Sequence, residues 1–444
     1  MNRAERRRQQ RLLKKPSARA NPEYIDDLRG QAATYLQAGD LKHAEQSLVD
    51  LLHLQPDDTE SLNLMGMLAG QRGDYITACR MLKKAVRIDP GHSHYHNNLA
   101  LALREAGRPE AAVAALRKAI TLDPTLVQAH NNLGNTLERT GDIKGAITAY
   151  RQAVQLDPNY SDAHFNLGKL LLLDVGKFDE AAEEFIASLR CILSGNTSMQ
   201  THSEAPRLDH ELARKALLDL KQALDKSSVE FFLRSGTLLG CIREGDLLEH
   251  DKDIDIGVFE QPDLGTLQDL LLKTGKFKSK ADRYRGQNRV SLTIFHNNGT
   301  AFDIYQHQDK NNHYLVEHFL PGRSFARQFT RFKLTPTAFL GTTFCIPDNS
   351  ELYLTELYGD DWHVPKPFFD SRVSSKNQAP SMEIISKCYA YCRIDEALNR
   401  ADTERALALC DQILEKFSDD EIAGDVKNFL KGKRQPDLTG TSNR

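Results

Sequence analysis

The chain has 444 residues, of which 27% are charged, and a formal net charge of −3 at pH 7. A chain of this length is too long for one hydrophobic core, so two or three domains are expected. The small net charge excludes a global attraction to nucleic acid or to an anionic membrane, so no nucleic-acid partner is predicted.

The segment 1–22 is basic and lacks the apolar region that a signal peptide needs, which predicts a flexible arm. No apolar run approaches the ~20 residues that span a bilayer, so we predict no transmembrane segment. The seven cysteines are scattered and form no Cys-x-x-Cys pair, so a disulfide framework is not indicated. This cysteine usage favours a reducing compartment and predicts a cytoplasmic protein.

A period of 34 residues dominates the segment 23–193. The positions that recur are Pro56, Pro90, Pro124 and Pro158; Gly39, Gly73, Gly107 and Gly141; and Ala44, Ala78, Ala112 and Ala146. This is the period of tetratricopeptide repeats, in which the alanine lets two antiparallel helices approach closely. The glycine ends the first helix and the proline ends the second. With a fifth unit that follows, we predict an all-α tetratricopeptide solenoid of five repeats with a concave groove.

Three asparagines, Asn98, Asn132 and Asn166, occupy the same position of successive repeats. We predict that they line the groove as a short amide ladder, which hydrogen-bonds the backbone of a bound protein or peptide. The arrangement resembles the asparagine ladder in the repeats of O-linked GlcNAc transferase, although the equivalent earlier positions are Leu64 and Gly30. The alternative is that these asparagines only bond to neighbouring helix ends.

A polar segment, 194–206, is predicted to be a linker. An amphipathic helix and an apolar strand then lead into the segment 234–257, which carries the most informative motif of the chain. This segment ends in alternating carboxylate and apolar residues. Successive side chains of a strand point to opposite faces, so Asp253 and Asp255 share one face while the isoleucines between them are buried on the other.

Two carboxylates about 4 Å apart repel by roughly 4 kcal/mol at an effective dielectric constant near 20. A divalent cation between them removes this cost, and Mg²⁺ prefers such hard oxygen ligands, often together with substrate phosphates. The alternative is a solvated acidic strand end.

Gly236 and Thr237 open a helix whose N–H groups and positive end can bind a phosphate of the substrate. Arg243, two helical turns further on, could reach the same phosphate or form an ordinary surface ion pair.

The order of these motifs resembles that of the LicD/fukutin family of the nucleotidyltransferase fold. The matching elements are the turn Gly236–Gly240, Arg243 on the following helix, the strand Asp253–Ile256, and a later signature from Ile346 to Trp362. The resemblance covers about 207–370 and implies an α+β nucleotidyltransferase-fold domain, which we predict over 207–378. One departure is Lys252, a cation that stands beside the acids and that we assign to substrate binding.

The resemblance also implies a third carboxylate on a neighbouring strand. Asp303 supplies it within the strand-like run 301–305, and the turn 297–299 before this run is a hairpin signal. Asp253, Asp255 and Asp303 would then hold Mg²⁺ or Mn²⁺, and one of them could take up the proton of an acceptor hydroxyl. Alone, Asp303 would be a strand-edge charge.

By resemblance, the expected activity is a metal-dependent transfer of a phospho-substituent of the phosphocholine or polyol phosphate type. The donor would be a nucleotide-diphospho compound, with a CDP-linked one suspected, and the acceptor a glycan hydroxyl. The repeats would recruit a protein partner or acceptor. One alternative is a non-catalytic scaffold with a nucleotide-binding domain, which loss of the carboxylates would mark. Another is a nucleotidyltransferase proper, but the spacing of 17 residues from Gly236 to Asp253 is longer than classical members have.

After Pro380 the sequence is helical again. The segment 380–431 is predicted to form a short α-helical C-terminal region, a degenerate repeat that packs back on the catalytic domain, and 432–444 a disordered tail. Because the linker has few apolar residues, a fragment that begins near Pro206 is expected to fold alone when these helices are kept.

Overall fold

The structure is a computed structural model. It describes 22–195, 209–249, 251–279, 291–320, 323–366, 368–375, 377 and 382–433. The predicted arm, most of the predicted linker and nearly all of the predicted tail lie outside these residues. The chain divides into two compact units, 1–167 and 168–444, and each unit is described by itself. No helix in the described part of the chain has the length and apolarity needed to cross a membrane.

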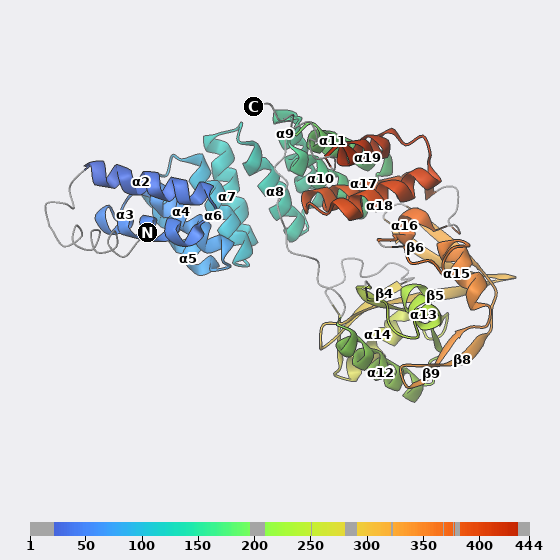
Figure 1. The fold of residues 1–444 in the computed structure, drawn as a ribbon. Coiled ribbons are helices and arrows are strands. Elements are labelled where there is room, and N and C mark those ends of the chain that lie inside the picture. The colour runs from blue at the N-terminus through green and yellow to red at the C-terminus, as the bar shows by residue number, and fades with distance from the viewer. Residues whose placement is uncertain are drawn as a thin grey trace, which may run out of the picture. The chain divides into compact units, whose positions relative to one another are not determined.

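The first unit is an array of paired helices (Figure 1, blue to cyan). They are α2 (Pro22–Gln37), α3 (Leu41–Leu54), α4 (Thr59–Gln71), α5 (Tyr75–Ile88), α6 (Ser93–Glu105), α7 (Pro109–Leu122), α8 (Val127–Thr140) and α9 (Ile143–Leu156). The repeated glycines adopt positive φ between the helices of a pair, for example 79° at Gly73. Asp74 then caps α5 by accepting from the Thr77 N–H at 3.0 Å. The repeated alanines, such as Ala78, are fully buried between the helices, so the predicted tetratricopeptide fold is confirmed.

Amide side chains connect successive repeats of this unit. Asn98 donates to Asn63 at 2.9 Å, Asn132 donates to Asn97 at 2.9 Å, and Asn166 donates to Asn131 at 3.1 Å. The ladder therefore extends one repeat further than predicted, because Asn63, rather than the aligned Leu64, provides the partner. The bonds also join asparagine to asparagine and not, as the alternative supposed, asparagine to a helix end. Peptide binding by Asn98, Asn132 and Asn166 stays a prediction.

Replacing Asn98, Asn132 and Asn166 together by alanine is expected to have two effects. A net hydrogen bond contributes about 0.5–1.5 kcal/mol, so the loss of three bonds between repeats should lower the melting temperature of the helical array. The substitution should also weaken the binding of a peptide in the groove by roughly tenfold or more, because the peptide backbone loses hydrogen bonds to the three amides. Thermal unfolding and peptide titration separate the two effects. Unchanged peptide affinity in the folded variant would exclude the ladder from partner binding.

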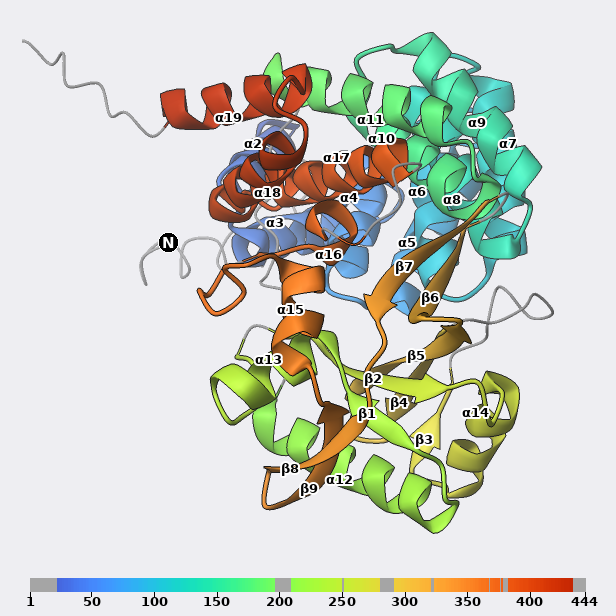
Figure 2. The same ribbon diagram turned by 90° about the vertical axis from the view of Figure 1, so that its right-hand side faces the viewer.

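The second unit contains the last helix of the fifth repeat and a further repeat-like pair. Its helices α11 (Phe178–Leu193), α17 (Glu383–Asn399), α18 (Thr403–Lys416) and α19 (Glu421–Lys433) lie side by side (Figures 1 and 2). Between α17 and α18, Ala401 adopts a φ of 55°, where the earlier repeats have glycine. Asp402 caps α18 by accepting from the Arg405 N–H, and Ala406 is fully buried. These features are those of a sixth repeat, which supports the prediction of a degenerate one.

Helix α17 packs directly on α11, which precedes it by almost two hundred residues. The Ser188 hydroxyl donates to the buried Asp395 carboxylate at 2.5 Å, and the Cys388 thiol contacts the Phe178 carbonyl oxygen at 3.2 Å. The domain with the acidic motif is thus inserted between the fifth and sixth repeats. A fragment that begins near Pro206 would lack α11, which packs on α17, so this packing argues against the expectation that the fragment folds alone.

The inserted domain is built on a mixed sheet with the strand order β1-β2-β5-β4-β3, from which the β6–β7 hairpin extends (Figure 2). Among the strand pairs of the described residues, only β2 and β5 run parallel. The strands are β1 (Phe231–Leu233), β2 (Asp253–Phe259), β3 (Phe277–Lys278), β4 (Ser291–His296), β5 (Ala301–Lys310), β6 (His313–Leu320) and β7 (Arg323–Thr330). A separate hairpin consists of β8 (Leu334–Phe339) and β9 (Thr342–Pro347). The predicted order of a helical solenoid, an α+β domain and C-terminal helices is confirmed.

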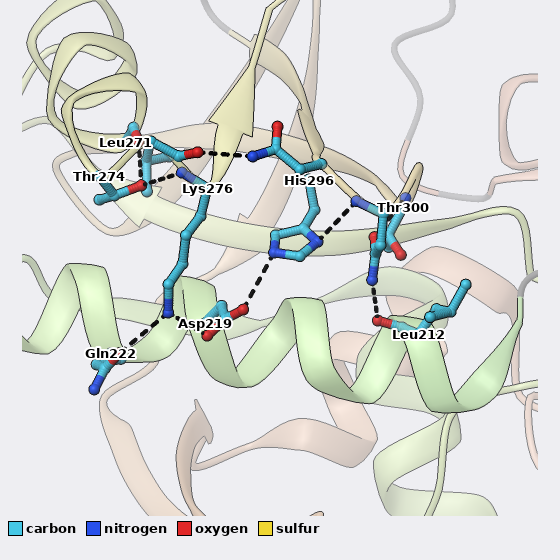
Figure 3. A network of polar contacts seen from close by, with 11 residues as sticks. Leu212, Asp219, Gln222, Leu271, Thr274, Lys276, His296 and Thr300 are labelled. Atoms are coloured by element: carbon cyan, nitrogen blue, oxygen red, sulfur yellow. Dashed lines mark hydrogen bonds and ion pairs between the residues drawn. The ribbon is translucent and has the colours of Figure 1, made fainter.

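Helices of the inserted domain complete its core. They are α12 (His210–Lys226), α13 (Ser235–Arg243), α14 (Leu264–Lys273), α15 (Ser350–Tyr358) and the short α16 (Ser371–Ser374). A polar network ties α12 to the edge of the sheet (Figure 3). In it, Asp219 accepts from Lys276 at 2.6 Å and contacts the His296 ring at 3.2 Å. Although burial works against ionisation, these two residues hold the pKa of Asp219 below its usual value.

Candidate active site

The predicted acids meet where β2 and β5 run side by side. Asp255 lies directly opposite Asp303 in the parallel register, and Asp253 is on the same face as Asp255. Ile254 and Ile256, on the other face, are fully buried in the core. On the next strand, the Thr293 hydroxyl donates to the Asp303 carboxylate at 2.6 Å and orients it. The fold therefore brings together the three carboxylates that the sequence predicted.

The acids disfavour one another's ionised forms. Burial, and then the charge of Asp303, raise the pKa of Asp253 to about 6. Burial, and then Asp253, raise the pKa of Asp255 well above its usual value, against the opposing effect of Arg234. Asp251 was not predicted, but burial and Asp253 raise its pKa to about 7. Such mutual repulsion is expected of carboxylates that are held close together in a buried site.

The turn that precedes α13 is joined to the acidic strand. Ser235 adopts a positive φ of 43°, a strained conformation for a residue with a side chain. It directs the Gly236 N–H to Asp255 Oδ2 at 3.2 Å, and the Asp255 N–H donates to the Thr237 hydroxyl at 2.8 Å. A Cβ at Gly236 would lie 2.2 Å from Asp251 Oδ2, so this position requires glycine. The turn thus positions the acids, while phosphate binding by Gly236 and Thr237 remains a prediction.

The two predicted basic groups have different surroundings. Arg243 lies at the end of α13 opposite to Gly236 and forms an ion pair with Glu244 at 2.8 Å. The structure therefore gives Arg243 the surface ion pair that was the alternative, and not a place among the acids. Lys252 is adjacent to Asp253 in the chain, and its charge helps to lower the pKa of that acid. Burial, and then Arg405 and Arg393 of the sixth repeat, lower the pKa of Lys252 itself.

A buried arginine next to the acids was missed by the sequence reasoning. Arg234 is 1% exposed, and its guanidinium lies over the Tyr305 ring at 4.0 Å from the ring centroid. Although burial works against its charge, Tyr353, Tyr305 and Asp255 raise its pKa. The local signal was an arginine that directly follows the apolar run 229–233, but arginine is mostly exposed in proteins, so the sequence alone did not indicate its burial.

The chemistry of the oxygen donors fits a hard divalent cation. Neighbouring carboxylates, together with burial, raise the pKa values of Asp251, Asp253 and Asp255, and a cation would relieve this repulsion. Among the residues that the structure describes, however, no three His, Cys, Asp or Glu side chains already form a metal-binding group. Metal binding by Asp253, Asp255 and Asp303 is therefore taken up as a proposal below.

Asp303→Ala is expected to lower donor turnover by at least the ~100-fold typical of losing a positioned acid–base group. Thr293→Val, which keeps the acid and removes only its 2.6 Å hydrogen bond, should cause a smaller loss. Asp309→Ala is a matched control, because Asp309 is on the same strand but pairs with Arg331. Near wild-type turnover by Asp303→Ala would identify Asp303 as a strand-edge charge.

Comparisons with known proteins agree with this organisation. The family model described as LicD/FKTN/FKRP, nucleotidyltransferase domain, matches 228–349, and tetratricopeptide repeat models match 59–92, 100–141 and 139–175. The "Ribitol-5-phosphate transferase FKTN" of Mus musculus is 29% identical over 180 residues, which are 38% of this chain and 36% of that protein. The Homo sapiens protein of the same name is 28% identical over 179 residues, 38% of this chain and 37% of that protein.

The match thus spans little more than a third of the length of these curated relatives. Among solved structures, the crystal structure of MamA is 25% identical with a TM-score of 0.33, and the match covers 37% of this chain and 96% of that chain. The repeat models match 59–92 and 100–175 of the helical array, and the LicD/FKTN/FKRP model includes the acidic motif. The chain is a tetratricopeptide repeat protein that carries a LicD/fukutin-family domain.

Proposed function

We propose that the inserted domain is a metal-dependent transferase. It moves a phospho-substituent, of the polyol phosphate or phosphocholine type, from a nucleotide-diphospho donor to a glycan hydroxyl. The observation that carries the proposal is the position of Asp255 opposite Asp303 on parallel strands, within the segment that the LicD/FKTN/FKRP model matches. The name of the FKTN relatives favours ribitol phosphate as the transferred group, and a CDP-linked donor is the first to test.

Different residues of the chain would bind the metal, position the carboxylates and accept the proton of the acceptor hydroxyl. Asp253, Asp255 and Asp303 would hold Mg²⁺ or Mn²⁺, which when bound neutralises phosphate charge and orients the acceptor hydroxyl. Thr293 fixes the carboxylate of Asp303, and the Gly236 N–H fixes that of Asp255. One of these acids, or Asp251 beside them, can accept the proton of the acceptor hydroxyl.

The repeats are proposed to recruit a protein partner or a proteinaceous acceptor. Asn132 and Asn166 each donate one amide bond between repeats. Asn98 donates to Asn63 and also contacts Met67 Sδ, and its oxygen accepts from the Asn97 amide. An asparagine amide has two N–H donors and an acceptor oxygen, so each keeps hydrogen-bonding capacity for a bound backbone. The partner is expected to be an extended peptide, since the ladder presents one amide per repeat.

Titration of the full-length chain with CDP-, UDP- and ATP-derived donors, with and without Mg²⁺, tests the proposal. We expect calorimetric binding of a CDP-linked polyol only in the presence of the metal, followed by transfer to a glycan. Binding that persists in excess EDTA would contradict the metal-dependent mechanism. Metal-dependent donor binding without transfer to any glycan would instead favour the scaffold with a nucleotide-binding domain.

A further inference from the structure

Two arginines of the inserted domain are buried with unused hydrogen-bond donors. Arg234 is 1% exposed and Arg327, on β7, is 4% exposed. Within the described residues, Nε and Nη1 of Arg234 and Nε of Arg327 have no hydrogen-bond partner. A buried donor without a partner costs free energy, and a buried charge costs more. Both guanidinium groups are therefore placed to bind a ligand that supplies acceptors.

A third arginine belongs to the same cluster. Burial, and then the charges of Arg234 and Arg372, lower the pKa of Arg327 to about 10, which shows that the three cations oppose one another. Arg327 Nη2 also donates to the carbonyl oxygen of Ser371, the residue that precedes Arg372 on α16, at 2.8 Å. The cluster also adjoins the acidic strand, since the backbone N–H of Arg234 donates to the Asp255 carbonyl oxygen at 3.4 Å.

The charges of the acids and of the arginines partly compensate each other in the metal-free protein. When a divalent cation occupies the acids, their negative charge is shared with the metal. The three arginines then have less compensation, and an oxyanion beside them becomes more favourable. A planar guanidinium presents paired N–H donors that match the oxygens of a phosphate.

We propose that Arg234, Arg327 and Arg372 form an oxyanion subsite for a phosphate group of the substrate, beside the acids that hold the metal. The inference rests on the proposed function and deepens it. The phosphate comes either from the donor diphosphate or from a phosphorylated polyol on the transferred group or acceptor. Arg372 lies outside 228–349, so the family model does not include it.

The sixth repeat holds Arg372 in this position. On α18, Gln412 Oε1 accepts from the Asp370 N–H and from the Ser374 hydroxyl, both at 2.9 Å. Its Nε2 donates to the Phe368 carbonyl oxygen at 3.0 Å, so one side chain fixes both ends of the segment around α16. Gln412 is thus a positioning residue, through which the repeat array contributes to the subsite.

The test is calorimetric titration of the full-length chain with pyrophosphate and with ribitol 5-phosphate in Mg²⁺. Arg372→Gln is expected to weaken the binding of at least one of these two ligands by about tenfold or more, the scale of a lost charge-assisted hydrogen bond. Arg327→Lys should weaken the same ligand. Arg331→Gln is the matched control, because Arg331 follows β7 but pairs with Asp309, and it should bind as the wild type does. A loss limited to pyrophosphate assigns the subsite to the donor diphosphate, and a loss for ribitol 5-phosphate assigns it to a phosphorylated polyol.

Gln412→Ala should weaken the same ligand, and the double variant with Arg372→Gln should be no weaker than Arg372→Gln alone, since both act through one group. Wild-type affinity of folded Arg372→Gln and Arg327→Lys for both ligands would overturn the proposal. These titrations need no turnover. Lost anion binding in the variants therefore supports the subsite even if the wild type consumes no donor. Absence of donor turnover would count only against the proposed transferase.

Discussion

Asp255→Asn is expected to abolish donor turnover and to weaken Mg²⁺ or Mn²⁺ binding, while the domain keeps its fold. Asparagine is nearly isosteric with aspartate, and its amide oxygen can still accept from the Gly236 N–H, which donates to Asp255 at 3.2 Å. It removes, however, a charged oxygen ligand from the centre of the acid cluster. Turnover is measured with the donor that binds in the titration above, and Asp309→Asn, on the neighbouring strand β5, serves as the control.

The same substitution is expected to stabilise the metal-free protein at neutral pH. Burial, and then Asp253, raise the pKa of Asp255 well above its usual value. A raised folded-state pKa means that the neutral carboxyl stabilises the fold at low pH, and that this contribution is lost as the pH rises through the folded pKa. The variant should therefore melt above the wild type at pH 7, and the difference should vanish below about pH 4.

Two results would contradict this assignment. Wild-type turnover in excess EDTA would exclude the metal, and an Asp255→Asn variant that melts at or below the wild-type temperature at pH 7 would show that repulsion among the acids does not strain the fold. The pH series distinguishes a change in charge from a general loss of packing, because a packing defect would persist at low pH.

A fragment that begins at Asp209 is expected to melt about 10 °C or more below one that begins at Ser161, although both contain the whole inserted domain. The shorter fragment lacks α11, so buried residues of α17 such as Cys388 and Asp395 lose the helix that they contact. Exposing a fully buried apolar side chain costs about 1.5–3 kcal/mol, and a domain of this size loses about 2–4 °C per kcal/mol. Circular dichroism at 222 nm during heating compares the two fragments.

Ser188→Ala in the full-length chain is the matched point substitution. It removes the hydroxyl that donates to Asp395 but leaves the Asn399 amide, which donates to the same carboxylate at 2.7 Å. The free energy of unfolding is therefore expected to fall by about 1–3 kcal/mol, the cost of leaving a buried polar group partly unsatisfied. If the fragment from Asp209 melts as cooperatively and as high as the longer one, α17 and its neighbours do not depend on α11.

Features that follow from a local sequence period were predictable from the sequence. The 34-residue period defines the helix pairs, and the alternation around Asp253 and Asp255 defines the face that the acids share. Asp303 came from a family resemblance, because nothing local shows that β5 pairs with β2. The partner Asn63 was missed for a different reason. The alignment of the repeats pairs Asn98 with Leu64, whereas in the structure the Asn98 amide reaches the preceding residue, Asn63.

The arginines could not have been predicted from any single segment. Arg234, Arg327 and Arg372 come from a turn, a hairpin strand and a four-residue helix, and only tertiary packing brings them into electrostatic contact. Each alone is an ordinary charged residue in its local sequence. The same holds for Gln412, whose role depends on the contact between the sixth repeat and α16.

The insertion of the domain between two packed helices has a consequence for synthesis. Ser188 of α11 and its partner Asp395 are separated by 207 residues. At about 5–20 residues per second, α11 is outside the ribosome for roughly 10–40 s before its partner has been made. During this time the face of α11 that packs on α17 has no native partner. A nascent chain that stalls inside the inserted domain therefore carries an uncovered repeat helix, by which quality control can recognise it as unfinished.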